Sequence, residues 1–273
     1  MTAHQTDDYV LGTNDQELAR LGLQHRVWRS RALDGWRRAG FTVGQRLLDV
    51  GSGPGYAALD LAEIVGPTGE VIALERSARY LDALRGAAVS RGLPNITPRQ
   101  IELESDPLPA FGADGAWVRW VFAFLSRPRD LVSRIASALR TGGAVVIHEY
   151  FDYATWAFAE HSELFEEFVQ TVMRSWRAGG GEPDIARPLM GWLEESGFRI
   201  TSLQTYLDVV SPNEFVFQWP VAFVESGTRR LAELGDITET RAQEIRDDFY
   251  GRAAAPHARM TMPGVLEIVA RKD

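Results

Sequence analysis

Residues 47–62, LLDVGSGPGYAALDLA, constrain the fold of this chain more than any other segment. An apolar run leads into three glycines at alternate positions, Gly51, Gly53 and Gly55, and an alanine- and leucine-rich helical pattern follows. Glycine adopts positive φ without a steric penalty and lets a ligand approach the backbone closely. The segment therefore predicts a buried strand, an open turn, and a helix whose first N–H groups can receive an anion.

Short apolar runs alternate with helical patterns around this turn. Strands are expected at residues 46–50, 70–75, 96–103, 115–124 and 143–150, and helices at residues 56–65, 77–91 and 128–140. Strands that alternate with helices form parallel sheets, because each helix carries the chain back across one face. The pattern therefore predicts an α/β fold with a doubly wound, mostly parallel sheet that is covered on both faces.

The two ends of the chain add further elements to this plan. Residues 14–39 carry a long amphipathic helical pattern. The last third predicts helices at residues 157–177, 185–197 and 213–252, a flexible joint at 179–184, and strands at 198–210 and 264–273. We expect the helices of residues 157–177 and 213–252 to roof the ligand-binding edge of the sheet.

The composition restricts the partners and the chemistry of the chain. It has no cysteine, which excludes disulfides and cysteine-ligated metal sites and suits a reducing cytoplasm. Its 37 acidic and 29 basic residues give a net charge of −8, which repels a phosphate backbone, so nucleic acid is not an expected partner. The first ten residues lack the apolar core of a signal peptide, and no apolar run approaches the ~20 residues that span a bilayer. We expect a cytoplasmic protein without a membrane partner.

Two acidic residues beside the glycine turn bear on the choice of ligand. Residues 53–58 fit the looser dinucleotide pattern G-x-G-x-x-A. However, Asp49 would repel a pyrophosphate, whereas it would attract the ammonium group of an amino-acid end such as that of S-adenosylmethionine. Glu75 follows about 20 residues beyond Gly53, where a carboxylate accepts hydrogen bonds from ribose hydroxyls in either kind of site.

In its ordered motifs the chain resembles the class I S-adenosylmethionine-dependent methyltransferases, in particular their bacterial small-molecule branch. LLDVGSGPG resembles the first motif of that family, VIALERS is similar to the second, and IELESDPLP at residues 101–109 occupies the place of the adenine-contacting motif. ADGAWVRWVFAFLSRP and ALRTGGAVVIHEY resemble the fourth strand, helix and fifth strand. Two positions depart from the family pattern: Thr141 stands where proline is usual, and Glu102 stands where aspartate is most common.

The resemblance implies a Rossmann-like sheet of seven strands, the last of them antiparallel, with N-terminal and inserted lid helices. It also implies that the chain binds S-adenosylmethionine and leaves S-adenosylhomocysteine as product. The cofactor contacts implied in this way are Asp49, Gly51, Ser52, Gly53, Gly55, Glu75, Arg76, Glu102 and Leu103, joined by Tyr9 and Gln24 from a segment that is similar to the N-terminal lids of this branch.

We therefore expect one enlarged domain over residues 1–273. Its parts are an N-terminal helical lid at 1–40, a cofactor-binding half at 41–150, the substrate-side helices with the sixth strand and lid insertions at 151–262, and the final strand at 263–273.

Three residues are candidates for a general base that removes a proton from the methyl acceptor. His148 and Glu149 end the fifth strand on the ligand side and point to opposite faces, because side chains alternate along a strand. His161 is expected on a helical stripe with Phe165 and Trp176. Each of these residues also has an ordinary structural interpretation, as a hydrogen-bonded histidine or a loop-fixing carboxylate.

Charged and aromatic residues in apolar surroundings complete the candidate site. Arg119 lies inside an apolar strand and must find a partner, either an acid or the carboxylate of the cofactor. The chain has eight tryptophans, and several are expected near ligand-side loops or lid helices, namely Trp28, Trp120, Trp156 and Trp219. They indicate either a pocket that stacks on a planar or apolar acceptor or an aromatic core.

The sequence thus predicts a methyltransferase that moves a methyl group to an O, N or C atom of a small apolar or aromatic metabolite of biosynthetic, secondary metabolism. The reaction would be an in-line displacement that needs no metal. A monomer and a homodimer are both open. Two alternatives remain: a protein that uses bound S-adenosylmethionine for a non-methylating reaction, and a nicotinamide-dependent oxidoreductase.

Overall fold

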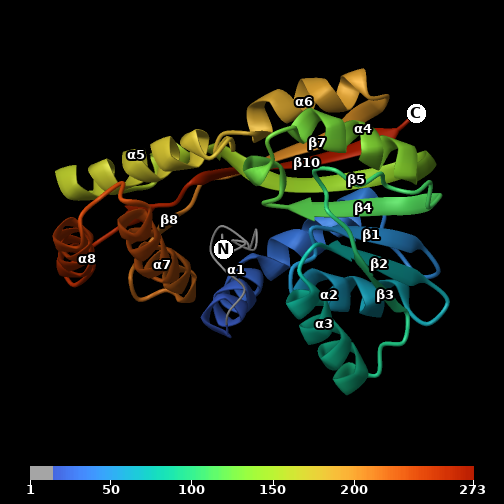
Figure 1. The fold of residues 1–273 in the computed structure, drawn as a ribbon, viewed down its shortest axis with the longest axis horizontal. Helices are drawn as coiled ribbons and strands as arrows, with labels where there is room; N and C mark the ends of the chain where they lie inside the picture. Colours follow the sequence, from blue (N-terminus) through green and yellow to red (C-terminus); the bar gives the residue numbers. More distant parts are fainter. Residues whose placement is uncertain (1–14) are drawn as a thin grey trace, which may run out of the picture.

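The computed structural model describes residues 15–273, and Tyr9 therefore lies outside the described residues. A seven-stranded sheet forms the centre of the fold, in the order β3-β2-β1-β4-β5-β10-β7 (Figure 1). Its strands are β1 (Arg46–Val50), β2 (Glu70–Glu75), β3 (Ile96–Gln100), β4 (Ala113–Arg119), β5 (Leu139–Asp152), β7 (Phe198–Tyr206) and β10 (Gly264–Lys272). Strands β1 to β5 pair in parallel, and β10 runs antiparallel to both of its neighbours. The predicted fold class is confirmed.

Helices cover both faces of this sheet (Figure 1). Helices α1 (Asp15–Ala39), α2 (Tyr56–Val65) and α3 (Ala78–Arg91) pack on one face, and α4 (Pro128–Ala138) and α6 (Ala186–Glu195) pack on the other. Leu47 belongs to the apolar core under α1 and α2, whereas its neighbour Leu48 belongs to the core under α4 and α6. Strand β1 is therefore buried on both faces, which explains its unbroken apolar sequence.

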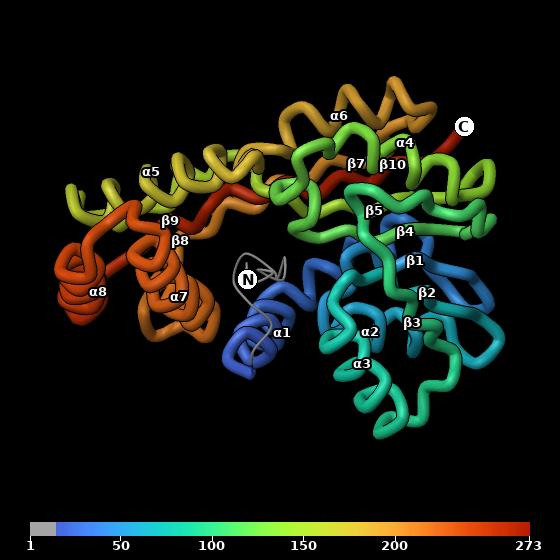
Figure 2. Tube along the Cα trace, in the orientation of Figure 1, coloured from blue at the N-terminus to red at the C-terminus, as the bar shows by residue number. Residues whose placement is uncertain are grey.

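A third layer of structure extends from one end of the sheet (Figures 1 and 2). It contains α5 (Glu163–Ala178), α7 (Gln218–Leu234), α8 (Glu239–Ala253) and a small sheet of β6 (Ala157–Phe158), β9 (Met260–Thr261) and β8 (Val209–Val210). Its core is dominated by aromatic side chains, and Trp28 of α1 and Trp120, which follows β4, belong to the same cluster. This lid region is thus continuous with the body of the protein.

Several element boundaries differ from the predicted ones. Strand β3 ends at Gln100 and β4 ends at Arg119, and a short 3-10 helix, η1 (Phe122–Phe124), occupies the rest of the second apolar run. Two further 3-10 turns are η2 (Tyr153–Thr155) and η3 (Phe215–Phe217). The expected helix at 213–252 is two helices, because Gly235 with φ +80° ends α7 and the Thr238 side chain caps α8.

The start of α5 also differs from the prediction. The hydroxyl of Ser162 accepts the N–H of Phe165 and caps the helix, while Ala157 and Phe158 pair with β9. His161 therefore precedes the helix. No helix within residues 15–273 has the length and apolar character needed to span a bilayer.

Candidate active site

The glycine turn after β1 lies where the strand order reverses between β1 and β4, the usual ligand-binding edge of an open α/β sheet. Gly51, Gly53 and Gly55 all have positive φ, at +69°, +53° and +82°. A Cβ atom on Gly51 would collide with Val121, and one on Gly55 would collide with Leu84. A Cβ atom on Gly53 would meet no atom within 4 Å. The outer two glycines therefore allow close packing, and Gly53 leaves open space in front of the turn.

Glu75 at the end of β2 holds this turn in place. One carboxylate oxygen accepts the N–H of Gly53 at 2.9 Å, and the other accepts the N–H of Ser77 at 2.8 Å. Glu75 is 4% exposed, and burial raises the pKa of its carboxyl, although these N–H donors act in the opposite direction. A carboxylate has about four acceptor positions, so beside the backbone donors of Gly53, Ser77 and Arg76 it can still accept a hydrogen bond from a ligand.

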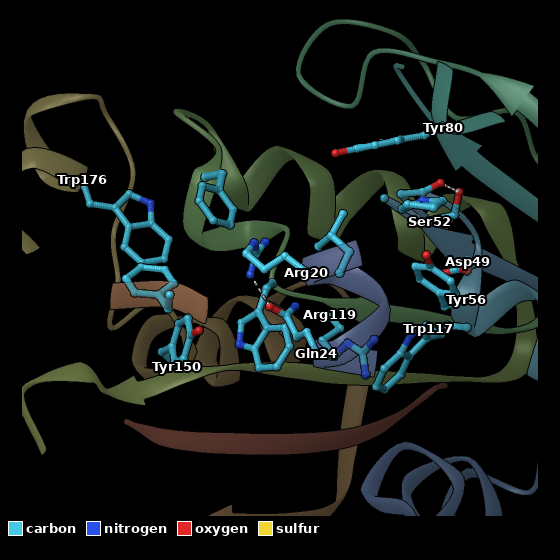
Figure 3. A pocket seen from close by; sticks show the side chains of 18 residues that line it. Arg20, Gln24, Asp49, Ser52, Tyr56, Tyr80, Trp117, Arg119, Tyr150 and Trp176 are labelled. Carbon is cyan, nitrogen blue, oxygen red and sulfur yellow. Dashed lines mark hydrogen bonds between the residues drawn. The ribbon is translucent and has the colours of Figure 1, made fainter. Parts of the chain in front are cut away.

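The first of three adjoining cavities lies in front of the glycine turn (Figure 3). Among the predicted cofactor contacts, Gln24, Asp49, Gly51, Ser52, Gly53 and Arg119 line it. Gly55 does not line it and instead stands at the N-cap position of α2. Figure 3 shows Ser52, Asp49 and Tyr56 toward one end and Tyr150 with Trp176 toward the other.

Two charged groups of opposite sign, the buried Asp49 and the half-buried Arg119, face this cavity. Asp49 is 2% exposed, and its Oδ2 atom has no hydrogen-bond partner among the described residues. The Nη1 atom of Arg119 is also buried without a hydrogen-bond partner among these residues. Burial raises the pKa of Asp49 to about 7, although Arg119 and the Ala58 N–H act to lower it. Burial lowers the pKa of Arg119 to about 10, so the guanidinium stays charged at neutral pH. Leaving such atoms unpaired is costly, which makes them candidate ligand contacts.

A side-chain network on α1 and α2 holds Arg119 in position. Its Nη2 atom lies 3.1 Å from Nδ1 of His25, and its guanidinium lies against the ring of Trp120. A guanidinium can only donate, so Nδ1 accepts and Nε2 of His25 carries the proton. That Nε2 donates to Asp60 at 3.0 Å, and Arg29 donates to the same carboxylate at 2.7 Å. Burial lowers the pKa of His25, which favours this neutral form.

A second cavity of about 520 Å³ extends from the turn toward the loop after β3. The other predicted cofactor contacts, Glu75, Arg76, Glu102 and Leu103, all line it. Arg76 and Glu102 lie 3.8 Å apart, so the expected adenine-side loop and the loop after β2 meet here. The first and second cavities share Gly51, Trp120 and Phe124, so they adjoin, and we refer to them together as the cleft.

A third cavity of about 410 Å³ lies between α5 and α7, and most of its lining is apolar. It shares Phe124, Trp176 and Phe223 with the first cavity. A molecule held there would therefore adjoin whatever occupies the first cavity.

Trp120 borders both the first and the second cavity. It has φ +50°, a costly backbone conformation for a bulky residue, and its N–H donates to the His148 carbonyl at 3.0 Å. Its ring stacks on Tyr150 at 5.5 Å and on Trp219 at 5.6 Å between centroids. Trp120 lines the first two cavities. Trp28, Trp156 and Trp219, by contrast, are buried in the aromatic core and do not line these three cavities.

The predicted general bases lie away from the three cavities. His148 is fully buried, and its Nε2 atom lies 2.7 Å from Glu267 of β10. Glu149 is also fully buried and accepts the N–H groups of Val121 and Phe122, and burial raises its pKa to about 8. The two side chains point to opposite faces, as expected, but both are engaged in the fold.

His161 also lies elsewhere. It is largely exposed, stands before α5 rather than on its apolar stripe, and lies 3.9 Å from Glu166. The geometry therefore does not support a general base at His148, Glu149 or His161, and we assign none there. Within the described part of the chain, no cluster of three or more His, Asp or Glu residues could hold a metal ion.

Sequence reasoning missed several residues of the cleft. Tyr56, Tyr80, Tyr150, Phe124, Trp176 and Phe223 all line the first cavity. The positions of Tyr56 and Tyr80 could have been recognised from the sequence. Tyr56 begins the helix that follows β1, and Tyr80 lies in the first turn of the helix that follows β2. Trp176 and Phe223 could not be recognised in this way, since they come from helices far along the chain and reach the cavity only through tertiary packing.

Known proteins with similar sequences are methyltransferases. The model of a methyltransferase domain matches residues 47–143. A ribosomal RNA small subunit methyltransferase G of Methylococcus capsulatus is 36% identical over 43% of this chain and 55% of its own length. A ubiquinone/menaquinone biosynthesis C-methyltransferase of Pseudomonas fluorescens is 25% identical over 47% of this chain and 50% of its own length. The chain thus spans about half the length of the curated relatives it matches.

Solved structures share the fold over most of the chain. A putative methyltransferase of Bacillus halodurans has a TM-score of 0.61 at 16% identity and covers 89% of this chain and 99% of its own. The [4+2]-cyclase SpnF has a TM-score of 0.56 at 20% identity, with 89% and 80% covered. An S-adenosylmethionine-dependent methyltransferase of Mesorhizobium loti has a TM-score of 0.52 at 18% identity, with 85% and 92% covered. At these identities the likeness concerns the fold alone.

Proposed function

Because the chain belongs to the class I S-adenosylmethionine-dependent methyltransferases, we propose that it transfers a methyl group from that cofactor to a small molecule. The single observation that carries the proposal is the pair of unpartnered buried atoms in the first cavity, Oδ2 of Asp49 and Nη1 of Arg119. One carboxylate and one guanidinium complement the ammonium and carboxylate of an amino-acid end. A dinucleotide would bring its phosphates against Asp49 instead.

The remaining cofactor contacts follow from the cleft. Glu75 would accept the ribose hydroxyls with the lone pairs that the turn leaves over, while Glu102 and Leu103 line the part of the cleft where the resemblance expects adenine. Gly53 supplies the open space in front of the turn. When bound, S-adenosylmethionine supplies a methyl group that its sulfonium charge has already activated.

The contribution of the chain to the chemistry is chiefly positioning. Fixing two reactants in line supplies roughly 7–11 kcal/mol of a barrier, and the buried aromatic walls of the cleft exclude water. Among the described residues that line the first and third cavities there is no histidine and no glutamate. Burial raises the pKa of the Tyr150 phenol, which keeps it protonated. We therefore expect an acceptor atom that is nucleophilic without a histidine or glutamate base.

The third cavity supports a small apolar acceptor. Its volume of about 410 Å³ lies in the usual range for small-molecule sites. The rRNA-modifying relative raises RNA as another acceptor. A net charge of −8 opposes RNA binding, and a cavity between two helices suits a compact molecule better than a polynucleotide.

A non-methylating use of the cofactor is the second candidate function. The same fold occurs in a [4+2]-cyclase, and the aromatic lining of the cleft could equally orient an apolar polyene for cyclisation.

Two measurements test the proposal. Calorimetry should show tight binding of S-adenosylhomocysteine and no response to NAD or NADP; the reverse result would reject the cofactor assignment. Incubation with methyl-labelled S-adenosylmethionine and a panel of small acceptors should then transfer label. Tight cofactor binding with no label transferred, while an apolar polyene is converted, would favour the non-methylating alternative.

A further inference from the structure

The lining of the third cavity restricts the chemistry of the molecule that it can bind. We propose that it binds a flat apolar acceptor bearing a carbonyl or carboxylate oxygen, and that Nε1–H of Trp176 and Nε–H of Arg230 donate hydrogen bonds to that oxygen. This inference rests on the proposed function, because it places the acceptor beside the cofactor cleft.

The shape of the cavity argues for an elongated apolar molecule. One face of α7 lines it with Phe223, Gly227, Leu231 and Leu234, which recur at helical spacing. Phe223 also borders the first cavity. Arg230 lies seven residues further along the helix, about 10 Å at 1.5 Å per residue. A molecule that reaches from the cofactor cleft to Arg230 thus has the length of two or three fused rings.

Trp176 supplies the first unmatched donor. Its Nε1 atom is buried and has no hydrogen-bond partner among residues 15–273. The indole ring lies against Phe124, with 4.6 Å between centroids, which fixes its orientation. A Cβ atom on Gly181 would stand 2.7 Å from Nε1. Gly181, which lines the same cavity, therefore lets the backbone pass close beside the N–H edge of the ring.

Arg230 supplies the second unmatched donor. Its Nη1 atom lies 3.2 Å from Glu233, whereas its buried Nε atom pairs with no described residue. A buried donor without a partner costs about 1–3 kcal/mol, and an oxygen on the ligand would remove that cost. Both unmatched atoms are donors, so the cavity selects for an acceptor oxygen and not for an amine. Asp236 also lines the cavity but is exposed.

The test compares three probes of equal shape on the full chain saturated with S-adenosylhomocysteine. These are 2-naphthoate, 2-acetonaphthone and 2-ethylnaphthalene, titrated by ligand-observed NMR. We expect at least one of the two oxygen-bearing probes to bind about tenfold more tightly than the hydrocarbon. A stronger naphthoate identifies a carboxylate site, and a stronger or equal ketone identifies a carbonyl site. Equal binding of all three, or binding of none, overturns the inference.

Substitutions then locate the interaction. Arg230→Met and Trp176→Phe should each reduce the preference for oxygen several-fold, while Arg229→Met should not change it. Arg229 is the matched control, since it is an exposed arginine on the same helix and contacts Gln16. A preference that survives both Arg230→Met and Trp176→Phe contradicts the assignment.

A blocking variant separates this inference from the proposed function. Ala178 lines the cavity but is exposed, so Ala178→Phe should fill the space without disturbing the core. We expect it to abolish probe binding while calorimetry shows an unchanged affinity for S-adenosylhomocysteine. Probe binding that persists in Ala178→Phe counts against the third cavity. Failure of the unsubstituted protein to bind S-adenosylhomocysteine counts against the proposed function instead.

Discussion

The first and third cavities adjoin but present opposite chemistry to a ligand. The first presents a carboxylate and a guanidinium, Asp49 and Arg119, each with one unpartnered buried atom, from the ends of two neighbouring strands. The third presents an apolar wall from two helices, with Trp176 and Arg230 as its unmatched donors. Because strand ends are rigid, the first cavity holds its two charged groups in one fixed arrangement.

Under the proposed function, this difference means that cofactor binding and acceptor binding depend on separate parts of the chain. The turn and strand ends of the sheet depend on backbone geometry that few sequences permit, because Gly51 and Gly55 face side chains that would collide with any Cβ atom. The helices α5 and α7 impose no such restriction on the residues that line the third cavity. Substitutions on these helices would therefore change the acceptor while the cofactor site stays the same.

The largest expected effect comes from removing the anionic half of the first cavity. Asp49→Asn should weaken the binding of S-adenosylhomocysteine about 100-fold, because a hydrogen bond to a charged group contributes about 1.5–3 kcal/mol. Calorimetry measures this loss. Glu149→Gln is the matched control, since Glu149 is an equally buried carboxylate of the same sheet, on β5, that lies outside the cleft. Similar losses in both variants would contradict a direct contact by Asp49.

The pH dependence of binding tests the same contact without a substitution. The pKa of Asp49 is raised to about 7 in the free protein, and an ammonium ion beside it would lower that pKa on binding. Below pH 7 binding must therefore release a proton, and affinity should rise about tenfold from pH 6 to pH 8, mostly below pH 7, and then level off. Asp49→Asn should remove this dependence. An affinity that falls as pH rises through 7 would contradict the assignment.

The sequence predicted the elements around the glycine turn far better than the elements of the lid region. Strands β1 and β2 and helix α2 match their predicted bounds, because glycines and an unbroken apolar run mark them locally. The strands β6, β8 and β9 have two residues each and show no periodicity. The break between α7 and α8 depends on Gly235. The two-residue strands are decided by tertiary pairing, whereas the break between the two helices has local signals in Gly235 and in the Thr238 cap.

The candidate site was predictable to a similar extent. Asp49 and Arg119 stood out singly, one before a glycine turn and one inside an apolar strand, and the pairing of β1 with β4 brings them to one cavity. The role of His148 was not predictable, because its partner Glu267 lies on the antiparallel strand β10, 119 residues away. Residues that meet across such separations leave no local pattern.

A methyl group added to the glycine turn tests whether the space in front of Gly53 belongs to the binding site. Gly53→Ala places a Cβ atom in the space in front of the turn, where no protein atom lies within 4 Å. We expect about a tenfold loss of S-adenosylhomocysteine affinity, together with a loss of about 1–2 kcal/mol in unfolding free energy from the positive φ. Calorimetry and urea denaturation measure the two effects. Gly86→Ala on the exposed face of α3 is the control and should leave affinity unchanged. Full affinity in Gly53→Ala would remove the turn from the binding site.

The smallest effect is expected from the network behind Arg119. His25→Phe keeps a ring beside Tyr56 but removes the acceptor that holds Nη2 of Arg119. Loss of one such hydrogen bond corresponds to about 0.5–1.5 kcal/mol, so affinity for S-adenosylhomocysteine should fall about fivefold. The rise in affinity from pH 6 to pH 7 should persist, because Asp49 still titrates. Binding of 2-naphthoate to the third cavity should not change. A parallel loss at both cavities would mean that His25 supports the whole lid rather than the orientation of Arg119.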